Sequence, residues 1–116
     1  MITRSASETK KIASILAKEA SRLKPGASAL VIALSGNLGA GKTTFVQGFA
    51  RALGIKERVL SPTFVIMKIY MLQKRAQKKH FVHIDCYRIH SPRDLAPLGI
   101  KEIFRDKNAI VLIEWP

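Results

Sequence analysis

The sequence of 116 residues contains a single cysteine, Cys86, and only eight acidic residues against 20 lysines and arginines. One cysteine excludes an internal disulfide, which is consistent with a reducing compartment such as the cytoplasm. No apolar run approaches the roughly 20 residues that span a membrane, and residues 1–11 lack the apolar segment of a secretion signal. These absences predict a cytoplasmic protein without membrane contact.

The shortage of acids leaves a formal net charge of +12. Such an imbalance indicates a polyanionic neighbour, such as a nucleic acid or an acidic protein. The basic residues are scattered rather than gathered in one stripe, so a solvated basic surface with no partner is an equal alternative.

Helix-like and strand-like segments alternate along the chain, which predicts the α/β class. The 47% hydrophobic content and the length fit one domain, residues 1–116. Residues 5–23 read as an amphipathic helix and residues 29–34 as a strand. A second helix begins near Lys42 and ends near Leu53, with Gly54 placed as its cap.

Two strand-like runs, residues 64–72 and 81–87, predict a β-hairpin after this second helix. The basic segment between them would be its loose tip, carrying Lys74, Arg75, Lys78 and Lys79. A solvated turn and a contact with tRNA or a partner both remain open for this tip. Further along, residues 91–94 have the pattern of a helix start, and residues 110–114 form an apolar strand.

Residues 36–43 have the pattern G-x-x-x-x-G-K-T, the phosphate-binding P-loop, between a predicted strand and a predicted helix. Its glycines let backbone amides face phosphate oxygens, Lys42 can reach the β- and γ-phosphates, and the Thr43 hydroxyl can ligate Mg²⁺. The pattern predicts a nucleoside triphosphate with Mg²⁺, and the lack of an N-K-x-D guanine motif favours ATP. The predicted nucleotide-binding residues of the loop are Asn37, Leu38, Gly39, Ala40, Gly41, Lys42, Thr43 and Thr44.

Two acids at the ends of predicted strands, Asp85 and Glu114, are candidates to hold Mg²⁺ and to orient a nucleophile beside the phosphates. Strand alternation puts His83 and Asp85 on one face, with Cys86 on the other. We expect His83 to be a structural hydrogen-bonding residue and Cys86 a small buried hydrophobe.

Three further residues each have two alternative interpretations. Thr63 is either a switch residue that senses the γ-phosphate or an ordinary strand-opening residue. Trp115 either stacks on the nucleotide or covers the edge of the core. Arg88 pairs either with phosphate or with Asp85.

Five segments, residues 36–54, 61–64, 83–88, 98–104 and 111–116, resemble in order and spacing the TsaE family. These are bacterial ATPases of tRNA threonylcarbamoyladenosine biosynthesis. The resemblance covers nearly all of residues 6–116. It implies a P-loop NTPase-like sheet flanked by helices and an ATP-hydrolysing role beside the TsaD and TsaB proteins. That complex transfers a threonylcarbamoyl group to an adenosine beside the tRNA anticodon, and TsaE itself does not carry the group.

By motif, the resemblance implies that Lys42 and the loop amides hold phosphates, and that Thr43 with Glu114 organises Mg²⁺. Thr63 and Asp85 would be switch residues near the γ-phosphate, and Trp115 would lie beside the nucleotide. The relative roles of Asp85 and Glu114 stay open.

The chain departs from the family at two places. Asn37 stands where the family commonly has Asp, and family members continue past Pro116 with further strands that are missing here. A catalytically inactive nucleotide-binding or scaffold subunit is therefore an alternative, and a small-molecule kinase is a more distant one.

Overall fold

The computed structural model of the chain describes residues 6–24, 26–35, 39–56, 67–73, 77–86 and 99–115. Three helices and four strands form in these ranges, which confirms the predicted α/β class. The helices are α1 (Ala6–Arg22), α2 (Gly39–Ala52) and α3 (Ile100–Arg105). The strands are β1 (Leu30–Ser35), β2 (Met67–Met71), β3 (His80–Asp85) and β4 (Ala109–Trp115). No helix in these ranges is both long and apolar enough to cross a membrane.

The four strands form one sheet in the order β1-β4-β3-β2. Strands β1, β4 and β3 run parallel, and β2 pairs antiparallel with β3. The β2–β3 pair confirms the predicted hairpin. Because β1, β4 and β3 are parallel, their carboxyl ends lie at the same end of the sheet, where open α/β sheets bind their ligands.

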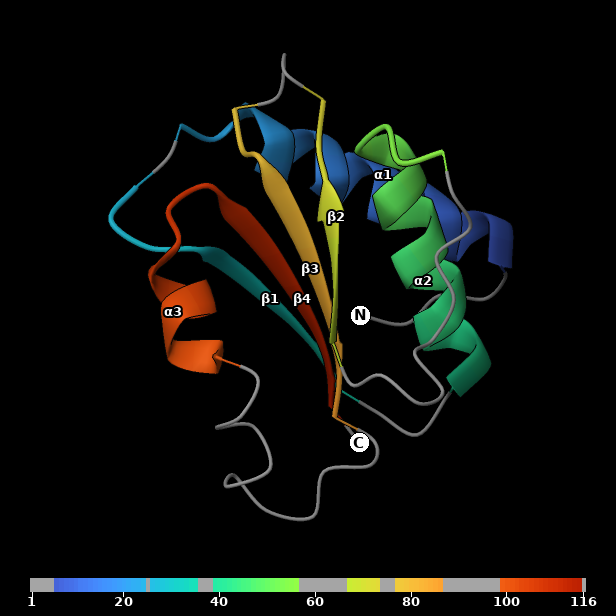
Figure 1. Cartoon of the computed structure of the whole chain (residues 1–116). Helices are drawn as coiled ribbons and strands as arrows, with labels where there is room; N and C mark the ends of the chain where they lie inside the picture. Colours follow the sequence, from blue (N-terminus) through green and yellow to red (C-terminus); the bar gives the residue numbers. More distant parts are fainter. Residues whose placement is uncertain are drawn as a thin grey trace.

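Helices α1 and α2 cover one face of the sheet, and α3 lies on the other (Figure 1). The α2 face holds the larger core, in which Phe49 of α2 and Phe81 of β3 are fully buried. Their ring centroids lie 5.7 Å apart, and Tyr70 of β2 continues the aromatic series at 5.9 Å from Phe81. These contacts bury much of the apolar surface that drives the folding of this layer.

Helices α1 and α2 approach each other closely because small residues line their contact. Ala13 and Ala17 of α1 are fully buried. A Cβ atom placed on Gly48 of α2 would lie 3.3 Å from Cβ of Ala13 and 3.2 Å from Cα of Lys10. The glycine therefore sets how near the two helices can come.

The α3 face holds a second, smaller core of buried residues. Ile100 and Ile103 of α3 pack against a cluster that includes Val82 of β3 and Val111 of β4. Helix α3 begins after Gly99, which has φ +69, and was not predicted from the sequence. The helix start predicted at residues 91–94 lies outside the described residues.

Lys78 corrects the prediction for the hairpin tip. Its side chain is buried rather than solvated, and its Nζ atom donates a hydrogen bond to the Lys107 carbonyl oxygen at 2.7 Å. The long aliphatic stem can lie in the protein while the ammonium reaches a carbonyl of the loop before β4. Lys79 is exposed, as predicted, while Lys74 and Arg75 lie outside the described residues.

The second helix begins at Gly39, three residues before the predicted start near Lys42. Its predicted end is confirmed, because Gly54 has φ +88, a conformation that favours glycine. The Gly54 amide donates to the Arg51 carbonyl at 3.0 Å, so the cap satisfies one of the last carbonyls of the helix.

Candidate functional site

The candidate site lies at the carboxyl ends of the parallel strands. Strand β1 ends at Ser35, directly before the P-loop residues, and α2 begins at Gly39. In the register of the sheet, Glu114 of β4 lies between Leu34 of β1 and Asp85 of β3. The two predicted acids are therefore direct neighbours in the sheet. Glu114 is on β4, which pairs with the strand that leads into the loop, and Asp85 is on β3, the next strand beyond it.

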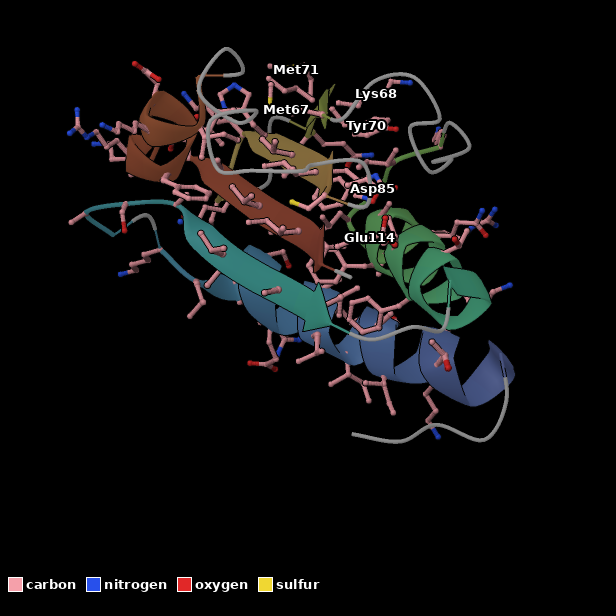
Figure 2. All side chains as sticks on the ribbon, turned by 90° about the horizontal axis from the view of Figure 1, so that it is seen from below. Met67, Lys68, Tyr70, Met71, Asp85 and Glu114 are labelled. Carbon is pink, nitrogen blue, oxygen red and sulfur yellow. The ribbon has the colours of Figure 1, made fainter. Side chains whose placement is uncertain are left out.

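Both acids face the layer that contains α2. Ile110 and Leu112 of β4 belong to the core under α1 and α2, so Glu114, two residues further, points to the same face. The same alternation from Phe81 places His83 and Asp85 on this face. Figure 2 shows Asp85 and Glu114 at this end of the sheet, on the side of α2. Helix α2, which follows the P-loop residues, and the two carboxylates therefore lie around the same region.

Glu114 is buried, with 5% of its surface exposed. Its Oε2 atom lies 2.8 Å from Nε2 of His83, and that imidazole is buried as well. A carboxylate accepts hydrogen bonds, so Nε2 carries the hydrogen and donates it. His83 thus forms a hydrogen bond, as expected, but its partner was not predicted. The pairing depends on the β3–β4 register, which joins positions 31 residues apart.

Asp85 is half-buried, and its negative charge affects Cys86, whose side chain lies on the opposite face of the strand. Burial, and then the nearby Asp85 carboxylate, raise the pKa of the Cys86 thiol above its ordinary value. Cys86 is buried, which confirms its predicted role as a small core residue. Its backbone N–H donates to the Glu114 carbonyl oxygen at 2.9 Å, so the backbone hydrogen bonding between these two chain segments continues one residue past the end of β3.

The first turn of α2 provides the other half of the site. It contains no acidic residue, so no carboxylate of that turn competes for its backbone N–H groups and the positive end of the helix dipole. Gly41 is exposed there, and Thr43 and Thr44 are half-buried. This turn is suited to an anion such as a phosphate group.

Several predicted site residues lie outside what the structure describes. Asn37, Leu38, Thr63 and Arg88 fall in the gaps between the described ranges. The backbones of Gly39, Ala40, Lys42 and Trp115 are placed in α2 and β4, but their side chains are not described. The roles of all these residues remain predictions.

The residues present fit a nucleotide with Mg²⁺ by their chemistry. A threonine hydroxyl and carboxylates are the oxygen ligands that Mg²⁺ prefers, and it usually takes only one or two from the protein. Among the described residues, no group of three or more His, Cys, Asp or Glu side chains is arranged to hold a metal ion. A magnesium ion here would therefore depend on phosphate and water oxygens for the rest of its shell.

Comparison with known proteins adds independent information. The family model of "Threonylcarbamoyl adenosine biosynthesis protein TsaE" matches residues 3–116. The tRNA threonylcarbamoyladenosine biosynthesis protein TsaE of Bacillus subtilis is 43% identical over 108 residues, which cover 93% of this chain and 60% of that protein. The protein of the same name from Haemophilus influenzae is 37% identical over 87 residues, covering 75% of this chain and 52% of the relative.

A solved structure shares the fold. The crystal structure of Bacillus subtilis YdiB matches with a TM-score of 0.67 and 37% sequence identity, covering 97% of this chain and 61% of that chain. The chain thus spans less than two thirds of the length of these relatives. The family model's match, over residues 3–116, includes residues 36–43 together with β3 and β4, which carry the two acids of the candidate site.

Proposed function

The chain belongs to the TsaE family, and on that premise we propose that it binds ATP with Mg²⁺ and hydrolyses the ATP. The main support for the proposal is that three features lie next to one another at the carboxyl ends of the parallel strands. The helix α2 begins shortly after β1, Glu114 lies one residue before the end of the neighbouring strand β4, and Asp85 ends β3 next to Glu114. An ATPase needs phosphate-binding amides and acids in this relation.

On this proposal the first turn of α2 holds the phosphates. Backbone N–H groups around Gly39 to Gly41 would donate to phosphate oxygens, and Lys42 would add a positive charge. The Thr43 hydroxyl and the Glu114 carboxylate would hold Mg²⁺. The ion would neutralise negative charge on the phosphate oxygens as the terminal phosphate is transferred to water.

The two acids, Glu114 and Asp85, would have different roles. Glu114 is buried and held by His83, which suits a group that must keep one orientation. Asp85 is only half-buried, which suits a group that contacts water or responds to the γ-phosphate. Thr63 would be the second γ-phosphate sensor, and Trp115 would lie beside the nucleotide.

We further propose that this activity serves tRNA threonylcarbamoyladenosine biosynthesis with the TsaD and TsaB proteins in the cytoplasm. The support is the name of the relatives, which are biosynthesis proteins for this modified nucleoside. Any contact with tRNA would come through the complex. The net charge of +12 is compatible with such a polyanionic setting.

The test is the release of inorganic phosphate from ATP by the purified chain, with and without Mg²⁺, TsaD and TsaB. We expect Mg²⁺-dependent turnover that rises with the partners. Lys42→Ala should abolish it, and Glu114→Gln should lower kcat at least about 100-fold, because it removes a carboxylate that would hold Mg²⁺, and loss of a residue that merely supports a metal ligand already costs about 10–100-fold. Matched controls are Lys101→Ala and Glu102→Gln, because both residues are exposed on α3, across the sheet from α2.

Other outcomes would favour the alternatives. Nucleotide binding without turnover, even with TsaD and TsaB present, would indicate a binding or scaffold subunit. Phosphate recovered on an acceptor molecule rather than as free ion would indicate a kinase. Equal activity of the wild type and Lys42→Ala would overturn the proposal.

A further inference from the structure

We propose that His83 is a positioning residue for Glu114, which holds the carboxylate in the orientation that the reaction needs. This role rests on the proposed function. The geometry that carries it is the 2.8 Å hydrogen bond from His83 Nε2 to Glu114 Oε2 between two adjacent strands. The side chains are 1% and 6% exposed, so water does not compete for this bond.

The hydrogen bond restricts Glu114 in a specific way. A glutamate has three side-chain torsions, and burial alone leaves rotation of the terminal carboxylate open. His83 engages one carboxylate oxygen, Oε2, from a rigid ring whose strand is joined to β4 by backbone hydrogen bonds. Fixing Oε2 fixes the plane in which the other oxygen lies. A catalytic carboxylate benefits from this kind of support because its orientation is then established before the substrate binds.

A merely structural role explains the pair less well. Two neighbours of His83 on this face are apolar, Phe81 on its own strand and Leu112 across from it on β4, while Lys68 lies across from it on β2 and Asp85 two residues further along β3. A buried hydrogen-bonded polar pair is often no more stabilising than apolar residues of similar size. Moreover, Nδ1 of His83 is buried without a hydrogen-bond partner among the described residues, which adds a cost. A polar pair placed in an apolar core at such a cost is typical of a functional site.

The topology also explains why the histidine lies on β3. His83 and Asp85 are two residues apart on β3 and face the same layer. In the register of the two strands, Glu114 of β4 lies opposite Asp85. Strand β3 therefore carries one acid, Asp85, and also the residue that positions the other acid, Glu114. A shift of β3 relative to β4 would disturb both acids together.

The experiment compares two replacements of His83 that differ in one property. In His83→Gln, the side-chain amide nitrogen can take the place of Nε2 and donate to Glu114. In His83→Leu, no donor remains. We expect His83→Leu to lower kcat for Mg²⁺-ATP hydrolysis at least about tenfold while KM for ATP changes less than about twofold, because the contact acts on orientation rather than on nucleotide binding. His83→Gln should recover most of kcat.

A second readout does not depend on turnover. The affinity for a fluorescent ATP analogue is measured with and without Mg²⁺. At saturating Mg²⁺, where KM is measured, we expect the wild type and His83→Leu to bind the analogue equally well. At limiting Mg²⁺ we expect His83→Leu to need a higher Mg²⁺ concentration for the same gain in affinity, and His83→Gln to need the wild-type concentration. Thermal unfolding of each variant shows whether the protein is folded. His83→Met, which also lacks a donor, replaces His83→Leu should the latter fail to fold.

His80 provides the matched control on the same strand. It lies at the amino end of β3, and its Nδ1 atom is 2.9 Å from Asp106 Oδ2, so it also forms a histidine–carboxylate contact. His80→Leu and His80→Gln should both leave kcat unchanged. An effect of His80→Leu as large as that of His83→Leu would mean that loss of any such contact disturbs the sheet, and would overturn the inference.

The remaining outcomes separate this inference from the function on which it rests. Full activity of His83→Leu beside an active wild type would overturn the role of His83 alone. An equal loss in His83→Leu and His83→Gln would show that the donated hydrogen bond is not what matters. A wild-type chain that neither binds nor hydrolyses ATP would overturn the proposed function and this role together.

Discussion

Cys86 and Glu114 show how closely residues of different character lie at the end of the sheet. The Cys86 backbone N–H is bonded to the Glu114 carbonyl, while its side chain belongs to the core on the α3 face. Glu114 points to the α2 face, into the candidate site. One backbone hydrogen bond therefore joins a buried apolar position to an acid for which we propose a role in Mg²⁺ binding.

The raised pKa of the Cys86 thiol leads to a prediction for stability against pH. In the folded protein the thiol keeps its proton to higher pH than in the unfolded chain, because burial and the Asp85 carboxylate disfavour the thiolate. As the pH rises above 9.0, the ordinary value for the thiol, the unfolded chain loses this proton first. The folded state then holds more protons, so this contribution to the free energy of unfolding is present below that pH and is lost above it.

The measurement compares urea unfolding of the wild type and Cys86→Ala between pH 7 and pH 10. We expect the free energy of unfolding of the wild type to fall more steeply with pH than that of the variant. Thiol labelling of the folded wild type at pH 7 should also be at least about tenfold slower than in denaturant, since only the exposed thiolate reacts. Parallel pH profiles for the two proteins would contradict the prediction.

At the scale of elements, the contact between α1 and α2 determines where the P-loop helix lies. Both helices cover the same face of the sheet (Figure 1), and Gly48 sits at their closest approach. The amino end of α2 is the part that would bind phosphate. A change in the packing of the two helices would therefore move the site as well as weaken the core.

We predict that Gly48→Leu destabilises the protein by about 1–3 kcal/mol, because the added side chain would overpack the contact with Lys10 and Ala13. The control is Gly26→Leu, since a Cβ atom at the exposed Gly26 meets nothing within 4 Å. This control should change the free energy of unfolding by less than about 0.5 kcal/mol. Denaturant unfolding measures both variants, and equal effects of the two replacements would refute the role assigned to Gly48.

At the scale of the whole molecule, the dominant feature is the excess of positive charge. Twenty basic residues against eight acidic ones give a net charge of +12 on 116 residues. Such a charge keeps a protein soluble but opposes its compact state through repulsion. Local ion pairs such as Arg22–Glu19, at 3.6 Å on the exposed surface of α1, relieve little of it.

We therefore predict that salt stabilises the chain in the absence of nucleotide. Raising NaCl from about 0.01 M to about 0.1 M shortens the screening length from about 30 Å to about 10 Å, which weakens repulsion between distant charges. We expect the Tm to rise by at least about 2 °C, which corresponds to roughly half a kcal/mol for a domain of this size. Thermal unfolding in NaCl and KCl should agree at equal concentration. A Tm that is constant or falls would show that repulsion does not limit stability.

Much of the architecture could be predicted from the sequence because it depends on local patterns. The helix α2 and the cap at Gly54 follow from residues close together in the chain. The alternation in β3 correctly assigned His83 and Cys86 to opposite faces. The two acids were recognised because each follows an apolar run, and the sheet places them side by side.

Only the tertiary structure decided the contacts between distant segments. The pairing of His83 with Glu114 and the burial of Lys78 against Lys107 each join positions about 30 residues apart, on strands or loops whose register no local pattern specifies. Helix α3 has six residues, too few for a helical period to be recognised in sequence, and packing of Ile100 and Ile103 on the sheet stabilises it. The sequence by itself thus determined the elements and the chemistry they carry, while the sheet register decided which groups act on one another, because that register follows from the packing of the whole core.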